Sequence, residues 1–317
     1  MPRFPTDTLT PSVHLSTIPF LTIFTAPKSF TDPHIAVIQR NAIQSWCHLD
    51  PQVDVLLVGD EPGMAEVAAE YGLRQLPDVA RNEAGTPLVS SIFSLARQAS
   101  PAPLLAYLNA DILLLPDFVA AARQVSRLAE RFLVIGQRWD LDVRELLDFS
   151  AGWEARLRQE VTSRGREHMP AGSDYFVFPR DMFMEIPDFA IGRAGWDNWM
   201  IFHARQQGWP VIDATPSITV IHQDHDYSHL PGGRPHYEHP ESQVNQSLAG
   251  GSANLYMVLD SDRQLVGGRL RRPKITLLRI LRRAEVWLTP PGSQRRGLYW
   301  KLARPFRRLR RKITGSL

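Results

Sequence analysis

An apolar run that ends at a single carboxylate constrains the fold of this chain more than any other feature of its sequence. Residues 103–108 (PLLAYL) and 112–115 (ILLL) flank the short polar element Asn109-Ala110-Asp111. A run this apolar is typical of a parallel-sheet strand covered on both faces, and ligands gather at the carboxyl ends of such strands. An ionised carboxylate there must be paired, coordinated or held at a crevice. We therefore predict a ligand site at Asp111, with a turn-forming Asx residue as the alternative.

Short buried strands alternate with amphipathic helices along the first half of the chain. Strands are predicted at 19–25, 54–58, 103–108 and 133–136, and helices at 34–46, 64–71, 88–98 and 118–132. This order predicts an α/β fold with a doubly wound, mostly parallel sheet. Further along, we expect a helix at 141–160, a strand at 175–179, a helix from 195 to 207 and one closing strand within 211–222.

Cysteine usage and hydropathy indicate the cellular compartment in which the protein is expected. Cys47 is the only cysteine, so the chain forms no internal disulfide and no thiolate zinc cluster, which suits a reducing cytoplasm. The first 26 residues lack a basic region followed by an unbroken apolar stretch, so no signal peptide is predicted. No stretch reaches the roughly 18 apolar residues of a membrane span. We expect a soluble, cytoplasmic protein.

Charge is distributed unevenly between the two ends of the chain. Residues 263–317 contain 17 Lys and Arg but one acid, Glu285, whereas residues 1–262 contain 32 acids and 19 Lys and Arg. We therefore predict two parts, a domain at 1–262 and a basic tail at 263–317, with the change near the Gly267-Gly268 turn.

The basic tail has the pattern of two amphipathic helices, at 274–288 and at 298–313, the second kinked by Pro305. Basic amphipathic helices with interfacial Trp and Tyr bind anionic membranes, at roughly 1 kcal/mol per basic residue near the surface. We expect the tail to hold the protein peripherally on the inner face of a membrane. The alternatives are packing on the acidic part of the same chain and, less favoured, nucleic-acid binding.

Polar residues follow the predicted strands in a distinctive order. Asp60 follows the second strand, Asn109 and Asp111 follow the central strand, Asp197 opens a helix, and His222 ends the last strand. Over about residues 19–225 this order resembles the GT-A class of nucleotide-sugar glycosyltransferases, and is similar to inverting family 2-like members. The implied fold is a GT-A type sheet followed by the basic helical tail.

The resemblance implies a donor site along the first half of the chain. Asp60 matches the acid that binds the nucleobase, and the loop containing Asn82 resembles the polar loop over the nucleotide. Asn109-Ala110-Asp111 stands where the class has its D-x-D element, with Asn in place of the first acid. Asn still forms hydrogen bonds with a ribose or sugar but is a poor ligand for a hard cation. Thr25, at the end of the first strand, completes the predicted donor contacts.

The resemblance also implies a metal ion and a catalytic base. Asp111 and His222 match the ligands of Mn²⁺ or Mg²⁺, whose charge would stabilise a departing nucleoside diphosphate. Asp197 matches the base that takes the proton of the acceptor hydroxyl, with inversion at the anomeric carbon. The alternatives are structural: Asp197 as a helix N-cap, Asp60 as a turn residue and His222 as a core histidine.

The predicted acceptor and lid contacts lie in the second half of the chain. They are Asp174 in the Gly-containing loop before the 175–179 strand, Trp196 and Asn198 beside the catalytic acid, and His225 and Tyr227 in the histidine-rich loop. The spacing of the histidines after residue 222 matches no zinc pattern, so a zinc hydrolase is less favoured.

The favoured function is transfer of a sugar from a nucleoside-diphosphate-sugar donor to a glycan or a lipid-linked acceptor. A nucleotidyltransferase would require a Gly-rich basic loop after the first strand, which residues 19–30 (PFLTIFTAPKSF) lack. The non-enzyme alternative, favoured by Asn109, is a carbohydrate-binding or scaffolding protein that kept the fold and lost catalysis.

Overall fold

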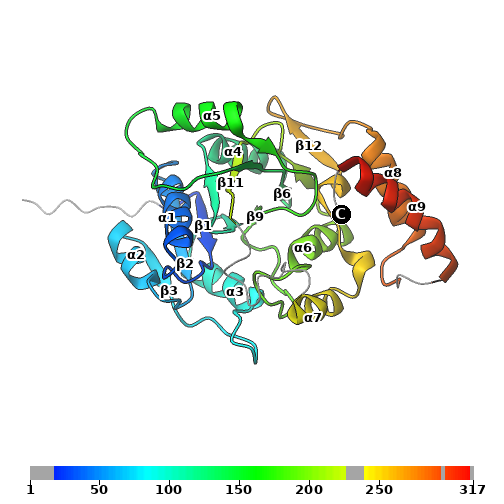
Figure 1. The fold of residues 1–317 in the computed structure, drawn as a ribbon, viewed down its shortest axis with the longest axis horizontal. Helices are drawn as coiled ribbons and strands as arrows, with labels where there is room; N and C mark the ends of the chain where they lie inside the picture. Colours follow the sequence, from blue (N-terminus) through cyan, green and yellow to red (C-terminus); the bar gives the residue numbers. More distant parts are fainter. Residues whose placement is uncertain (1–17, 226–238, 294–296, 315–317) are drawn as a thin grey trace, which may run out of the picture.

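The computed structural model describes residues 18–225, 239–293 and 297–314. Its main element is a nine-stranded sheet in the order β13-β12-β10-β6-β9-β4-β1-β2-β3 (Figure 1). Neighbouring strands are parallel except at β9, which runs antiparallel to β4 and β6, and at β13. The predicted α/β fold with a mostly parallel sheet is confirmed. The strands are β1 (Leu21–Thr25), β2 (Val53–Val58), β3 (Arg74–Leu76), β4 (Leu104–Leu108), β6 (Leu133–Ile135), β9 (Tyr175–Pro179), β10 (Val211–Asp213), β12 (Arg263–Val266) and β13 (Arg269–Arg271).

Helices cover both faces of this sheet. One apolar cluster joins one face to α1, α2 and α4, and a second joins the other face to α3 and α6. The side chains of β4 alternate between the two clusters, as the two-residue period of a strand requires. The helices are α1 (Pro33–Cys47), α2 (Met64–Tyr71), α3 (Val89–Ala99), α4 (Asp117–Leu128), α5 (Trp153–Arg164), α6 (Trp196–Gln206), α7 (Pro240–Leu248), α8 (Leu277–Leu288) and α9 (Gly297–Thr314).

A smaller four-stranded sheet lies beside the carboxyl end of β4. Its order is β5-β11-β7-β8, formed by β5 (Ile112–Leu114), β11 (Val220–Gln223), β7 (Trp139–Leu141) and β8 (Arg166–Glu167). β11 is antiparallel to β5 and parallel to β7, and His222 pairs in register with Ile112 on one side and Asp140 on the other. Segments distant in the sequence thus meet next to Asp111.

Three predicted elements differ from the observed ones. The predicted helix at 141–160 begins only at Trp153, because Asp148 accepts a hydrogen bond from the Ser150 amide and Gly152 adopts φ 83° before the helix. The predicted strand within 211–222 is two strands in different sheets. Asp213 Oδ1 accepts hydrogen bonds from the amide and hydroxyl of Thr215, and this turn separates them. The predicted helix at 118–132 ends at Leu128.

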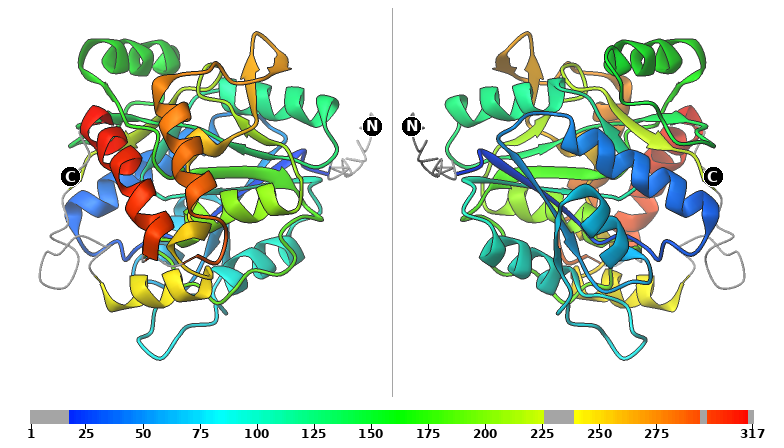
Figure 2. Two further views of the ribbon diagram at one scale, coloured as in Figure 1. Left: turned by 90° about the vertical axis from the view of Figure 1, so that its right-hand side faces the viewer. Right: turned by 90° about the vertical axis from the view of Figure 1, so that its left-hand side faces the viewer.

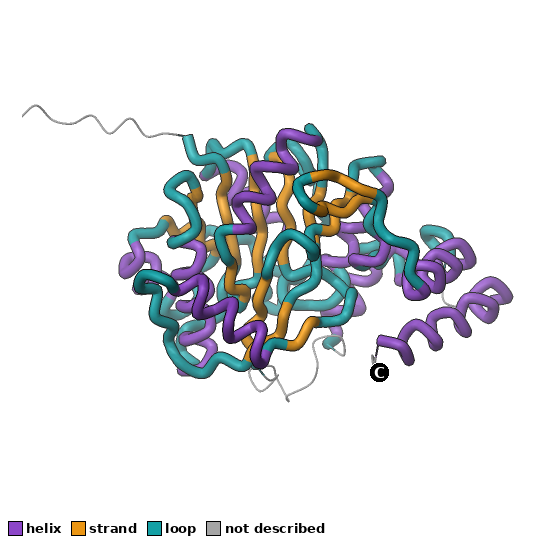
Figure 3. Tube along the Cα trace, turned by 90° about the horizontal axis from the view of Figure 1, so that it is seen from above, coloured by secondary structure: helices purple, strands orange, loops and turns teal. Residues whose placement is uncertain are grey.

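The C-terminal segment contributes to the sheet before it becomes helical. β12 pairs with β10 in parallel, so the nine-stranded sheet continues past the predicted boundary at residue 262. The helices α8 and α9 then pack against each other at one end of the molecule (Figures 1 and 3). Figure 2 shows α8 in orange beside α9 in red. Within the described ranges, no helix combines the length and the apolar composition needed to cross a bilayer.

Candidate active site

Asp111 lies in the link between β4 and β5, where hydrogen bonds from α1 and β11 hold the backbone. The Ile112 carbonyl accepts a hydrogen bond from the Trp46 indole at 2.8 Å, and the Asp111 carbonyl accepts one from the Gln223 amide at 3.1 Å. The carboxylate is consequently anchored between the main sheet and the smaller sheet. The prediction of a strand-end position for Asp111 agrees with this placement.

Two imidazoles converge on this carboxylate. Asp111 Oδ2 lies 3.1 Å from His225 Nε2 and 3.6 Å from His222 Nε2. The potential ligand atoms of the three residues lie within 4.8 Å of one another. The other carboxylate oxygen, Oδ1, is buried and has no hydrogen-bond partner among the described residues. One carboxylate and two imidazoles with an unsatisfied buried oxygen form a set that fits a divalent cation such as Mn²⁺.

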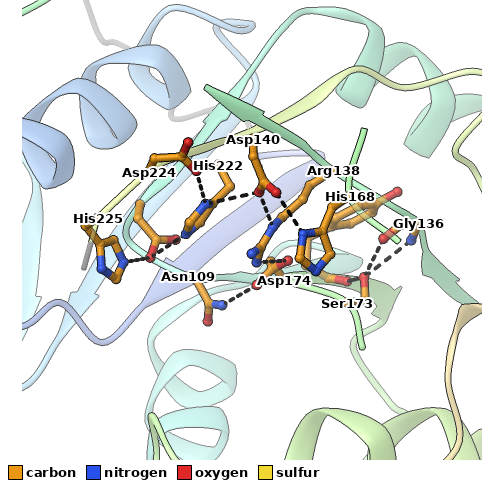
Figure 4. Close-up of polar contacts among 12 residues, drawn as sticks. Asn109, Gly136, Arg138, Asp140, His168, Ser173, Asp174, His222, Asp224 and His225 are labelled. Atoms are coloured by element: carbon orange, nitrogen blue, oxygen red, sulfur yellow. Dashed lines mark hydrogen bonds and ion pairs between the residues drawn. The ribbon is translucent and has the colours of Figure 1, made fainter. Parts of the chain in front are cut away.

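The second nitrogen of His222 faces two further carboxylates. His222 Nδ1 lies 3.3 Å from Asp140 Oδ1 and 3.7 Å from Asp224 Oδ1 (Figure 4). Asp140 is also contacted by Arg138 at 2.9 Å and by His168 at 2.8 Å. Carboxylates that orient the outer nitrogen of a histidine ligand are a recurring feature of metal sites.

The charges of this cluster reinforce one another. Burial alone would raise the pKa of the Asp111 carboxyl, but the His222 and His225 imidazoles and the Lys28 ammonium hold that pKa well below its usual range. Burial alone would lower the pKa of His222, but the surrounding carboxylates outweigh it and raise the pKa to about 9. The cluster therefore favours positive charge beside an ionised Asp111.

Asp174 connects this cluster to the D-x-D-like element. Asp174 Oδ1 accepts a hydrogen bond from Asn109 Nδ2 at 2.9 Å, and Asp174 Oδ2 lies 2.7 Å from Arg138. Arg138 therefore bridges Asp174 and Asp140 (Figure 4). Asn109, which replaces the first acid of the D-x-D element, orients Asp174 in this structure.

Asp197 lies in the first turn of α6, next to the loop that carries Asp174. The helix begins at Trp196 after Gly195, which adopts φ 112°, so Asp197 is not the N-cap. A methyl group on Gly172 would lie 2.1 Å from Asp197 Oδ2, so only glycine allows this approach. Burial is the main reason that the pKa of Asp197 rises to about 6.

Two predicted acceptor contacts already have partners within the protein. Trp196 is 5% exposed and packs edge-on against Tyr107. The Asn198 side chain donates a hydrogen bond to the Tyr256 carbonyl at 2.6 Å and holds the segment after α7. Tyr227 lies outside the described residues.

The predicted donor contacts lie along the carboxyl edge of β1 and β2. The Thr25 hydroxyl is buried and has no hydrogen-bond partner in the described part of the chain, whereas Asp60 is largely exposed and pairs with Arg81. Asn82 donates a hydrogen bond to Glu241 at 2.6 Å, and Glu241 in turn pairs with Arg193 at 2.8 Å. This places the Asn82 loop against α7.

Sequence reasoning did not identify several charged residues of the cluster as site residues. They are Lys28, Arg138, His168 and Asp224. Partial desolvation lowers the pKa of the Lys28 ammonium group, while attraction to Asp111 acts in the opposite direction. One sequence pattern could have identified Arg138. In Arg138-Trp-Asp140, charged and apolar residues alternate, which is typical of a strand with one polar face.

No family model matches this sequence, and no curated protein matches it. Solved structures with a similar fold include glycosyltransferases. One is glucosyl-3-phosphoglycerate synthase from Mycobacterium tuberculosis, in complex with Mn²⁺, UDP and phosphoglyceric acid, which is 16% identical. The comparison covers 81% of this chain and 87% of the synthase, with a TM-score of 0.46. A second is mannosyltransferase PcManGT from Pyrobaculum calidifontis, in complex with GDP-Man and Mn²⁺, which is 11% identical. That comparison covers 65% of this chain and 57% of the mannosyltransferase, with a TM-score of 0.41.

Proposed function

We propose that this protein is a metal-dependent glycosyltransferase that moves a sugar from a nucleoside-diphosphate-sugar donor to an acceptor hydroxyl. The observation that carries the proposal is the convergence of Asp111, His222 and His225 at the carboxyl edge of the sheet. These residues come from segments about a hundred positions apart in the sequence. Their meeting point lies beside Asp174 and Asn109, on the edge where open α/β sheets bind ligands.

A divalent cation fits the ligand set formed by Asp111, His222 and His225. When bound, it would supply positive charge opposite the diphosphate of the donor. Imidazole ligands favour Mn²⁺ over Mg²⁺. Lys28 brings a second positive charge to Asp111, so this edge of the sheet is suited to a diphosphate.

Asp197 is the proposed general base. With a pKa of about 6 it is ionised at neutral pH yet basic enough to accept the proton of a hydroxyl group as that group attacks the anomeric carbon. Asp174 is the other carboxylate nearby, but both of its oxygens are engaged, by Asn109 and by Arg138. A carboxylate held in this way is a poor covalent nucleophile, which supports a single displacement with inversion.

We also propose that the C-terminal helices bind an anionic membrane surface. Arg279, Arg282 and Arg310 are buried in contacts with acidic residues of the body and with Glu285 of α8. These arginines face inward, whereas several apolar side chains of the same helices face outward. Trp287 is 81% exposed, and Leu298 and Tyr299 are each 69% exposed. An exposed apolar surface with basic neighbours is typical of interfacial helices.

Calorimetric titration of UDP and GDP, with and without Mn²⁺, tests the donor site. We expect binding that requires Mn²⁺ and is lost in Asp111→Ala. The matched control is Asp181→Ala, which removes an exposed carboxylate whose nearest recorded cation is Arg131 at 4.0 Å, and which should bind as the wild type does. Nucleotide binding that does not require Mn²⁺ would favour the alternative of a carbohydrate-binding protein. The absence of nucleotide binding would favour the same alternative.

A panel of nucleotide sugars then tests the reaction itself. The wild type should hydrolyse or transfer from one donor class in the presence of Mn²⁺, and the anomeric configuration of the product should be inverted. A product with retained configuration would remove Asp197 from the role of base.

A further inference from the structure

A cleft of about 490 Å³ lies between the polar cluster and the C-terminal helices. One wall is polar and the other apolar. The polar wall contains Gln137, Asp140 and the 166–170 segment, whose last two residues, Met169 and Pro170, are apolar. The apolar wall belongs to the C-terminal helices and contains Leu278 and Ile313, with Thr314 beside them. The cleft therefore joins the candidate active site to the two C-terminal helices.

The polar wall suits hydroxyl groups better than a free phosphate. Its one guanidinium, that of Arg166, already pairs with Asp224 at 2.8 Å, and the wall also contains the carboxylates of Asp140 and Glu167. Carboxylates, an amide and a guanidinium offer both acceptors and donors to a neutral polyhydroxyl group, whereas the carboxylates repel an anion. Asp140 belongs to this wall and also faces His222, so a ligand at this wall is next to the proposed metal site.

The cleft also leads toward the proposed base. The wall residues Met169 and Pro170 continue directly into Ala171 and Gly172. Gly172 is the residue whose lack of a side chain accommodates Asp197. A hydroxylated group at the polar wall thus lies against the same segment that, two residues further on, approaches the carboxylate proposed to take its proton.

The apolar wall leads the other way, onto the exposed surface of the tail. Leu278 belongs to α8 and Ile313 to α9, and Ile313 is 46% exposed. The same helices expose Leu277, Leu302 and Leu309. An apolar chain that leaves the cleft past Ile313 would meet more apolar surface rather than water alone.

We infer that this cleft binds the acceptor, and that the acceptor is an amphiphile with a hydroxylated head group and an apolar chain. The inference rests on the proposed function, because the head group is taken as the attacking nucleophile. The hydroxylated head lies against the polar wall beside Asp140. The chain lies along Leu278 and Ile313, in the direction of the bilayer.

Photolabelling of the full-length protein tests where the acceptor binds. The probe is an octyl glucoside that carries a diazirine at the end of its chain, used below its micellar concentration and with methyl glucoside as competitor of the head group alone. We expect label on peptides that contain residues 166–170, Leu278 or Ile313. Label found only on Trp287, Leu298 or other outward residues would show simple adsorption and would overturn the inference.

A pair of variants tests the energetics. Leu278→Glu combined with Ile313→Glu should weaken octyl glucoside binding by about tenfold or more, since burial of an aliphatic chain against two leucine-sized side chains is lost. Leu128→Glu is the matched control, an exposed leucine at the end of α4 that lies outside the cleft lining, and should leave that binding unchanged. Equal loss in both proteins would contradict the cleft assignment. Since both sites are partly exposed, circular dichroism should show folded protein in each case.

The donor site is measured separately in the same proteins. Mn²⁺-dependent UDP or GDP binding should survive in the cleft variant, because neither Leu278 nor Ile313 belongs to the proposed ligand set of Asp111, His222 and His225. If the wild type binds nucleotide but shows no preference for octyl over methyl glucoside, the acceptor inference fails and the proposed function stands. If nucleotide binding is absent, the proposed function itself fails.

Discussion

Asp197 is the carboxylate at the candidate site whose pKa burial raises, to about 6. If it is the base, Asp197→Asn should reduce transfer by roughly 10²–10⁴-fold, the usual contribution of general base catalysis. Mn²⁺-dependent nucleotide binding should be unchanged, because Asp197 is not among the proposed metal ligands. Transfer should also fall as the pH drops through about 6, where the carboxylate becomes protonated. A variant with wild-type turnover would exclude the role.

The same substitution should stabilise the fold. Burial raises the pKa of Asp197 from 3.8 to about 6, so the native state favours the protonated form. That preference contributes stability below pH 4 and is lost as the pH rises through about 6. The full shift corresponds to about 3 kcal/mol at most, and to less here because the side chain keeps some contact with water.

Thermal melts at two pH values check this expectation. In the absence of metal and donor, Asp197→Asn should melt above the wild type at pH 8 and close to it at pH 4. Glu160→Gln is the control, because it makes the same carboxylate-to-amide change at an exposed position. Its melting temperature should equal that of the wild type at both pH values. A destabilised Asp197→Asn protein at pH 8 would mean that the carboxylate is needed for the structure.

Individual residues were only partly predictable from the sequence. Asp111 and His222 were singled out because each follows an apolar strand, and the structure brings them to 3.6 Å. Arg138 and His168 were not singled out as site residues, because their positions gain meaning only when β7 and β8 pair beside β11. Pairing between distant strands leaves little trace in a single sequence. The burial of Trp196 against Tyr107 was not predicted, because an aromatic residue beside a candidate base occurs equally at an acceptor site and in a core.

At the scale of elements, strongly periodic segments were predictable and turn-controlled ones were not. α2 and β9 have the predicted limits, since each is bounded by glycine or proline and has a consistent apolar pattern. The 141–152 segment has helical composition, yet Asp148 and Gly152 impose local turns on it. The 211–222 segment contains an Asx turn at Asp213 that sends its two ends into different sheets.

The ion pairs beneath α9 should be essential for its docking. Arg310 is buried and pairs with Glu285 at 3.0 Å, and Glu285 is also 3.4 Å from Arg282. Glu285→Ala leaves buried guanidinium groups without this carboxylate, and such changes typically cost about 3–5 kcal/mol. We expect faster tryptic cleavage within α9, measured by mass spectrometry.

Glu160→Ala is the control for this measurement, because Glu160 forms an exposed pair with Arg164 within one helix. Its digestion pattern should match that of the wild type. Unchanged protection of α9 in Glu285→Ala would show that apolar contacts alone hold the helix.

At the scale of the whole molecule, the position of the basic tail decides how membrane binding should be tested. Sequence reasoning set the boundary at residue 262, but a chain ending there would lack β12, which pairs with β10 in the sheet. The inward arginines were also not predictable, because a helical pattern shows which residues share a face but not which face is buried. Substitutions in the full-length chain avoid both problems.

Trp287→Glu combined with Leu298→Glu should abolish flotation with vesicles that contain phosphatidylserine. The expected reason is loss of the apolar contact together with added negative charge at an anionic surface. Leu128→Glu, at the exposed end of α4, is the matched control and should float as the wild type does. If the double variant floats equally well, the outward face of α8 and α9 is not the membrane contact.

The most direct test of the account is the position of Mn²⁺ in crystals grown with UDP or GDP, located by anomalous diffraction. The account predicts one ion within coordination distance of the Asp111 carboxylate and the His222 imidazole, facing the diphosphate. Nucleotide bound at this edge without a metal ion there, or an ion bound elsewhere in the molecule, would contradict it.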